Sequence, residues 1–108
     1  MKMNIDMKLI TPLELYAKIA HNDNLLLIDV RTDAERSLFN IGGVHLPLEE
    51  VLQNIHVIDI NKEIVFYCEK GIRSLIAIQR LEAKLGVEHL TNLQGGMEAW
   101  KKHFINNV

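Results

Sequence analysis

The segment IVFYCEKGIRS, residues 64–74, holds an apolar run, a short polar loop and the first residue of an amphipathic helix. The run at residues 64–67 has no alternating polar positions, which is typical of a strand buried on both faces of a parallel sheet. The helix predicted at residues 74–85 carries leucine and isoleucine at helical spacing, and Gly86 is expected to cap it in the left-handed conformation. A buried strand that leads through a short loop into a helix predicts an α/β fold.

Short apolar runs and amphipathic segments alternate along the rest of the chain, which supports the same fold class. Further strands are predicted at residues 25–30, 44–46 and 87–93. Further helices are predicted at residues 12–20, within 31–37, at 48–55 and from 97 to 104. Thr11 and Glu14 form a capping box for the first of these helices. The helical residues expected to face the core are Leu13, Tyr16, Ala17 and Ala20, then Leu75, Ile78, Leu81 and Leu85, then Met97, Trp100 and Phe104.

Length and composition predict one globular domain. A chain of 108 residues can bury a real core but leaves little room for a second domain, and we expect the core to span about residues 9–104. Hydrophobic residues make up 48% of the chain and charged residues 24%, a balance that excludes a disordered chain. Because no apolar run approaches the length of a membrane span, we expect no membrane insertion.

The charges and the cysteine count exclude several kinds of partner. Twelve basic and fourteen acidic residues give a net charge of -2, which offers no general reason to bind nucleic acid or anionic lipid. Asp6 and Lys8 stand where a signal peptide needs apolar residues, so a cytoplasmic location is expected. The expected oligomeric state is a monomer. The five histidines show no ligand spacing and Cys68 is the single cysteine, so no metal site is predicted.

Cys68 is the candidate catalytic residue. It follows a predicted central strand and precedes the long helix, and ligands bind at such junctions in open α/β sheets. A tight loop there, permitted by Gly71, turns backbone N–H groups inward, and a helix that starts at Ser74 adds the positive end of its dipole. With the cations Lys70 and Arg73, these groups should favour the thiolate, which is a nucleophile. The other interpretation is that Cys68 is simply a small buried hydrophobe.

Several stretches, in order along the chain, resemble the rhodanese-like sulfurtransferase domains. They are LLLIDVR at residues 25–31, Glu35, IGGVHLPL at 41–48, IVFYCEKGIRS at 64–74 and LQGGMEAW at 93–100. The resemblance implies a rhodanese-like three-layer α/β fold, with about five mostly parallel strands and helices on both faces. It also implies that sulfane sulfur is transferred through a persulfide of Cys68, with no metal or organic cofactor.

The resemblance assigns roles to the residues around Cys68. The loop expected to bind the substrate anion consists of Glu69, Lys70, Gly71, Ile72, Arg73 and Ser74. Asp29 and Arg31 are expected to brace this loop, with partners such as Glu35 or Arg73. Gly95 and Gly96 either lend backbone to the pocket or form a tight turn.

The sulfur donor and the partner stay open at this point. Thiosulfate-using members of the family commonly carry arginine directly after the cysteine, whereas this chain has Glu69. The candidate donors are thiosulfate and a small or protein-borne persulfide. The Glu69 carboxylate either opposes entry of a dianion, which favours a protein-borne persulfide, or merely pairs with a nearby cation. Residues 40–48 are similar to rhodanese-like domains fused to adenylating enzymes, so a sulfur carrier or an adenylating enzyme is a candidate partner.

Two other functions are considered. Cysteine phosphatases place five residues between the cysteine and the arginine of their loop, and arsenate reductases of this superfamily also have the longer loop. Four residues separate Cys68 from Arg73 here, which favours sulfur chemistry over phosphate or arsenate. A non-catalytic interaction module is the remaining alternative, and the presence of Cys68, Gly71 and Arg73 argues against it.

Overall fold

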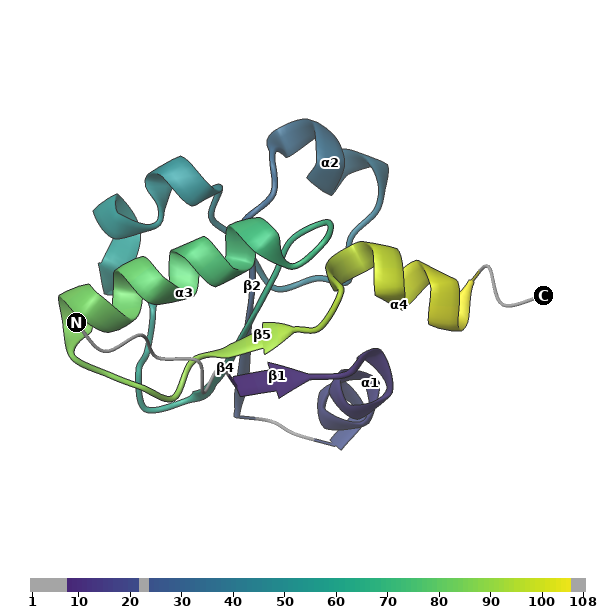
Figure 1. Ribbon diagram of the computed structural model, residues 1–108, viewed down its shortest axis with the longest axis horizontal. Coiled ribbons are helices and arrows are strands. Elements are labelled where there is room, and N and C mark those ends of the chain that lie inside the picture. The colour runs from purple at the N-terminus through teal and green to yellow at the C-terminus, as the bar shows by residue number, and fades with distance from the viewer. Residues whose placement is uncertain (1–7, 22–23, 106–108) are drawn as a thin grey trace.

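The computed structural model describes residues 8–21 and 24–105. These residues form a five-stranded sheet in the order β1-β5-β4-β2-β3, in which all paired strands are parallel (Figure 1). The strands are β1 (Lys8–Ile10), β2 (Leu25–Asp29), β3 (Val44–His45), β4 (Glu63–Tyr67) and β5 (Thr91–Leu93). The predicted parallel α/β fold is confirmed. Residues 1–7, on which the export prediction partly depends, lie outside the described part of the chain.

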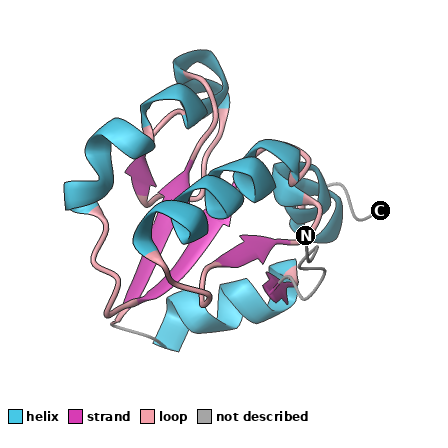
Figure 2. Ribbon diagram, turned by 60° about the vertical axis from the view of Figure 1, so that its left-hand side comes forward, coloured by secondary structure: helices cyan, strands magenta, loops and turns pink. Residues whose placement is uncertain are grey.

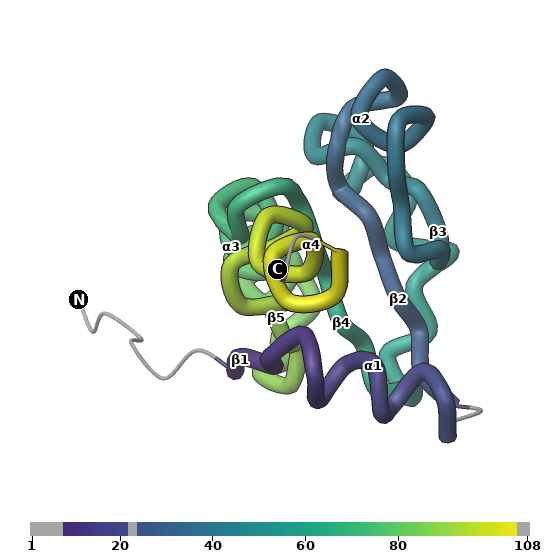
Figure 3. The backbone as a smooth tube through the Cα atoms, turned by 90° about the vertical axis from the view of Figure 1, so that its right-hand side faces the viewer, coloured from purple at the N-terminus to yellow at the C-terminus, as the bar shows by residue number. Residues whose placement is uncertain are grey.

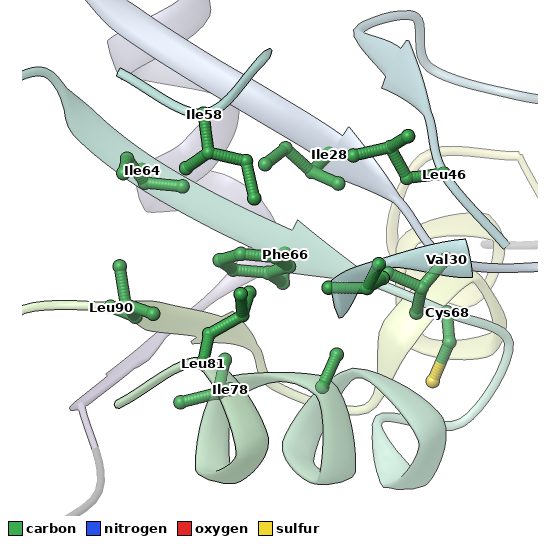
Figure 4. Close-up of a cluster of buried hydrophobic side chains, with 12 residues drawn as sticks. Ile28, Val30, Leu46, Ile58, Ile64, Phe66, Cys68, Ile78, Leu81 and Leu90 are labelled. Atoms are coloured by element: carbon green, nitrogen blue, oxygen red, sulfur yellow. The ribbon is translucent and has the colours of Figure 1, made fainter. Parts of the chain in front are cut away.

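The central strand β4 contributes side chains to both faces of the sheet. Ile64 and Phe66 are buried on one face, and Val65 and Tyr67 are buried on the other. Successive side chains of a strand point to opposite faces, so Cys68 continues the first series. Its sulfur lies beside the first turn of the helix that follows (Figure 4).

Helices cover both faces of the sheet, as the three-layer prediction requires. The long helix α3 (Ile72–Leu85) and the 3-10 segments η1 (Leu48–Glu50) and η2 (Leu52–Val57) cover the face that carries Phe66. In Figure 2, α3 lies in front of the strands. Helices α1 (Pro12–His21) and α4 (Gly96–Phe104) cover the other face and contact each other (Figure 3). Helix α2 (Asp33–Leu38) lies between β2 and β3 in the chain.

The predicted inward face of α1 is wrong. Leu15 is fully buried, whereas Leu13 and Tyr16 are 58% and 55% exposed. Leu15 contributes to the cluster between α1, α4 and the sheet, which turns the predicted apolar face outward. Tyr16 instead lies at the edge of α4, with its ring centroid 5.2 Å from that of Phe104. Because α1 contacts α4 only along one edge, it buries a narrower stripe of side chains than its sequence pattern predicts.

Other element boundaries also differ from the predictions. The short helix expected at residues 48–55 is a pair of 3-10 segments, and the second of them is kinked at Asn54. This residue has non-helical φ and ψ, and its side chain donates to Glu50 O at 2.8 Å. Strand β1 was not predicted, since its three residues carry no clear pattern. It lies at the edge of the sheet and pairs with β5. Strand β5 begins at Thr91 rather than at residue 87, and α3 begins at Ile72 rather than at Ser74.

The inward positions of the last two helices are mostly confirmed. In α3, Ile78 and Leu81 are buried, while Leu75 and Leu85 are half-buried. In α4, Met97 and Trp100 are buried, while Phe104 lies at the rim and is 36% exposed. Gly86 ends α3 in the left-handed conformation and its N–H donates to Glu82 O, as predicted.

Candidate active site

The loop that carries Cys68 joins the end of β4 to the start of α3. Gly71 precedes the helix with a φ of 92°, in the left-handed region that glycine adopts at little cost. This turn reverses the chain directly after Lys70, so that the N–H of Gly71 points back toward Cys68. The loop is therefore a tight turn around a side chain rather than an open connection.

Two backbone N–H groups and a hydroxyl surround the sulfur of Cys68. The side chain is buried, and Sγ lies 3.1 Å from the N–H nitrogen of Gly71 and 3.3 Å from that of Ser74. The hydroxyl of Ser74 lies 3.3 Å from the same sulfur. The Ser74 N–H belongs to the first turn of α3, where backbone donors lack helical partners and the helix dipole is positive. This geometry suits a sulfur atom that carries negative charge.

Asn92 of β5 also belongs to this site, and sequence reasoning missed it. Its side chain is 4% exposed, donates from Nδ2 to Gly71 O at 3.0 Å, and accepts from the Ser74 hydroxyl at 2.6 Å. One signal was present in the sequence. A polar amide within a predicted buried strand needs hydrogen-bond partners, and a strand beside β4 places those partners in the loop.

The glycine pair before α4 lies directly against the loop. The N–H groups of Met97 and Glu98, at the start of α4, donate to the carbonyl oxygens of Cys68 and Glu69 at 2.9 Å each. Gly96 has a φ of 61°, and a Cβ there would collide with both of those carbonyl oxygens, at 2.6 Å from that of Glu69. The sequence left open whether Gly95 and Gly96 form a tight turn or lend backbone to the site. The structure supports both, because the pair forms a turn that lies against the Cys68 loop.

The buried pair of Asp29 and Arg31 reaches the loop from β2. Arg31 donates from Nε and Nη2 to the two carboxylate oxygens of Asp29, at 3.0 Å each. Its Nη1 lies 3.4 Å from Glu69 Oε1. Arg31 therefore contacts the loop through Glu69 and not through Glu35 or Arg73, which the resemblance had suggested as partners.

Arg73 is held by Glu35 at the start of α2. Its two terminal nitrogens donate to the two carboxylate oxygens of Glu35 at 2.7 and 2.8 Å. The hydrogen bonds from Arg73 are the main reason that the pKa of Glu35 falls to about 2. This bidentate pair joins α2 to the first turn of α3, so Arg73 braces the loop as well as contributing charge.

The other predicted loop residues lie at the rim. Lys70 is exposed, and Ile72 is 63% exposed. The Glu69 side chain is 30% exposed and pairs with Arg31 and, at 4.0 Å, with Lys101 of α4. The structure thus brings Cys68, Gly71, Ser74 and Asn92 together and surrounds them with two ion-pair braces.

The described residues also bear on two other kinds of site. Residues 8–21 and 24–105 contain no group of three or more histidine, cysteine, aspartate or glutamate side chains that could hold a metal ion. Within the same residues, no helix has the length and hydropathy needed to cross a membrane.

A parallel sheet with helices on both faces defines the open α/β domains, in which ligands bind at the carboxyl ends of the strands. The single cysteine of this chain lies at that position, in the loop after the central strand. The chain belongs to the rhodanese-like domain family, whose family model matches residues 11–103.

Named relatives and solved structures agree with this assignment. A protein of Allochromatium vinosum named sulfurtransferase is 32% identical over 90 residues, which cover 82% of this chain and 83% of that protein. A Drosophila sechellia protein named adenylyltransferase and sulfurtransferase MOCS3 is 31% identical over 76% of this chain, and the match covers 20% of its length. The crystal structure of a rhodanese-like domain protein from Staphylococcus aureus has a TM-score of 0.78 and 32% identity, and covers 87% of this chain and 91% of its own.

Proposed function

We propose that the protein is a sulfurtransferase that carries sulfane sulfur as a persulfide of Cys68. The observation that carries this proposal is the pair of backbone N–H groups, from Gly71 and Ser74, within 3.3 Å of Sγ. Fixed backbone donors stabilise negative charge on the sulfur without any reorganisation during the reaction. Membership in a family whose relatives are named sulfurtransferases supports the same chemistry.

The reaction consists of two displacements at sulfur. The thiolate of Cys68 attacks the outer sulfur of a donor, a new S–S bond forms, and the donor's own S–S bond breaks. The remainder of the donor leaves with the electron pair of that bond, as sulfite in the case of thiosulfate. A nucleophilic acceptor then attacks the outer sulfur of the persulfide, and Cys68 leaves as the thiolate. Atoms and charge balance without an oxidant or a reductant.

The loop favours sulfur over a phosphoryl group. Gly71 already approaches Sγ to 3.1 Å, and Arg73 turns away to the Glu35 carboxylate. A tetrahedral oxyanion would need the arginine and a wider ring of donors. A single additional sulfur atom needs neither.

We propose a persulfide, small or protein-borne, rather than thiosulfate as the better donor. Glu69 places a carboxylate at the rim of the site, and its charge opposes the approach of a dianion. The similarity to the MOCS3 protein supports an adenylating enzyme as the partner in sulfur transfer. A sulfur carrier is the other candidate.

The persulfide is tested by mass spectrometry of the intact protein after incubation with thiosulfate, polysulfide or a protein persulfide. We expect a gain of one sulfur atom, removed by a thiol or cyanide, because the outer sulfur of a persulfide is open to nucleophiles. Cys68→Ser should abolish the adduct. Lack of an adduct with every donor contradicts the proposal and favours an interaction module, whereas Cys68-dependent hydrolysis of p-nitrophenyl phosphate favours a phosphatase.

The donor preference is tested with Glu69→Gln, which keeps the shape of the side chain and removes its charge. We expect kcat/KM for thiosulfate to rise about two- to fivefold at low salt, since one rim charge contributes up to about 1 kcal/mol. Turnover with a persulfide donor, whose reacting sulfur group carries one negative charge rather than two, should change less. Glu88→Gln is the control, because it makes the same change in net charge at an exposed position outside the site. It should leave the rates with both donors unaltered. An unchanged thiosulfate rate in the Glu69 variant contradicts the assigned role.

A further inference from the structure

We infer that Asn92 is a positioning residue that controls the charge on Cys68 by competing for the hydroxyl proton of Ser74. The three side chains form a buried row that starts at Sγ of Cys68, passes through Oγ of Ser74 and ends at Oδ1 of Asn92. The inference rests on the proposed function only in taking Cys68 as the nucleophile.

The orientation of the Asn92 amide follows from its neighbour in the loop. Gly71 O lies 3.0 Å from one terminal atom of the amide, and a carbonyl oxygen can only accept. That atom is therefore the nitrogen, because the opposite orientation would set two acceptor oxygens against each other. The amide oxygen must then face Ser74.

The direction of the Ser74 hydroxyl follows in turn. At 2.6 Å from Asn92 Oδ1, the hydroxyl oxygen must donate its single proton to the amide, which has no proton to offer on that side. Ser74 then presents lone pairs to Cys68 at 3.3 Å. A protonated thiol fits this arrangement, since its S–H can donate to Ser74. A thiolate does not, since it would meet another acceptor.

Formation of the thiolate therefore requires the hydroxyl to turn. When Cys68 loses its proton to solvent, the O–H of Ser74 rotates from Asn92 Oδ1 to Sγ and stays covalently intact. In the persulfide the charge moves to the outer sulfur, the inner sulfur becomes a weak acceptor, and the hydroxyl returns to Asn92. Asn92 thus stabilises the neutral forms of Sγ and opposes the thiolate, whereas the N–H groups of Gly71 and Ser74 favour it.

The test is a double-mutant cycle read out by alkylation of Cys68 with iodoacetamide as a function of pH. In Asn92→Ala the hydroxyl is released to Cys68, so the thiolate fraction on the acidic side of the transition should rise about two- to tenfold, the effect of one ordinary hydrogen bond. Asn92→Ala made together with Ser74→Ala should show no such rise over Ser74→Ala alone, because the proton that Asn92 competes for is absent.

The cycle separates this role from a structural one. Asn92 also braces Gly71, and loss of that brace would act equally with and without the Ser74 hydroxyl. The inference is overturned if Asn92→Ala changes the thiolate fraction equally with Ser74 present and in the Ser74→Ala background. It is also overturned if neither background shows a change. Circular dichroism checks that the variants fold, and Asn92→Val, which suits a strand and fills more of the space, replaces the alanine variant if it does not.

The outcome is also distinct from the test of the proposed function. Alkylation reports the charge on Cys68 whether or not the protein accepts sulfur. A positive cycle without any persulfide adduct supports the inference and contradicts the proposed function. A persulfide adduct without the expected result in the double-mutant cycle supports the proposed function and contradicts the inference about Asn92.

Discussion

Glu35 is a single side chain that serves two elements at once. Its carboxylate holds both terminal nitrogens of Arg73, and one of its oxygens also accepts from the N–H of Thr32 at 3.0 Å. The second contact completes the capping box of α2. Sequence reasoning named Glu35 as a supporting residue but did not predict that it caps a helix and pairs with the arginine of the Cys68 loop.

The lowered pKa of Glu35 makes stability depend on pH in a definite direction. Because its folded pKa of about 2 lies below the unfolded value of 4.5, its contribution is complete above about pH 5 and is lost as the pH falls toward 2. We expect Glu35→Gln to lower the free energy of unfolding by about 1 kcal/mol at neutral pH, after allowance for partial exposure. The difference in free energy of unfolding between the two proteins should shrink as the pH approaches about 2. Urea unfolding of both proteins across the acid range measures it.

Glu14 offers a matched control for this prediction. It forms the same capping box with Thr11 in α1 but is fully exposed, and glutamine can replace glutamate in such a box. Glu14→Gln should therefore show a smaller pH dependence than Glu35→Gln. Equal behaviour of the two variants would show that the Arg73 pair contributes nothing beyond the cap.

At the scale of elements, the Cys68 loop and α4 stabilise each other. The first N–H groups of α4 have no partner within their own helix, and the carbonyl oxygens of Cys68 and Glu69 supply one. This contact requires the two backbones to approach so closely that position 96 has no room for a Cβ. The helix thereby fixes the loop from the side opposite to α3.

We expect Gly96→Ala to lower the free energy of unfolding by about 3 kcal/mol or more, through a positive φ and a steric collision with the loop. Gly86→Ala is the control, because Gly86 has a similar φ of 69° but nothing within 4 Å of an added Cβ. Gly86→Ala should lower the free energy of unfolding by only about 1 kcal/mol. The difference between the two variants, measured by denaturant unfolding, isolates the close approach, and similar losses would refute it.

At the scale of the whole molecule, strand order assembles the site. Strands β5, β4 and β2 are neighbours in the sheet and run in the same direction, so their carboxyl ends lie at one edge. That edge collects Asn92 from β5, the Cys68 loop after β4, and Asp29 with Arg31 from β2. The sites of parallel α/β proteins arise at this edge because every strand there leads into a loop.

Local patterns predicted much of this arrangement. The apolar run before Cys68, the amphipathic helix after it and the glycine between them are local features, and they sufficed for the fold class, for the central strand and for the position of the loop. The face of α1 was predicted wrongly, because the stripe of side chains that a helix buries depends on the elements packed against it, which lie far away in the sequence. The short helix at residues 48–55 was predicted in the right place, but its 3-10 geometry and the kink at Asn54 were not predicted. That residues 9–104 form one independently folding unit stays a prediction.

The chain alone determined that a single thiol would follow a buried strand and precede a helix, since hydrophobic periodicity and glycine conformations are properties of short segments. Only the tertiary structure decided which groups surround that thiol. Asn92 and Gly96 lie more than twenty residues from Cys68 in the chain, and they reach it because β5 pairs with β4 in parallel. Hydrogen bonds act over about 3 Å, so the pairing of strands decides which distant residues come within that reach.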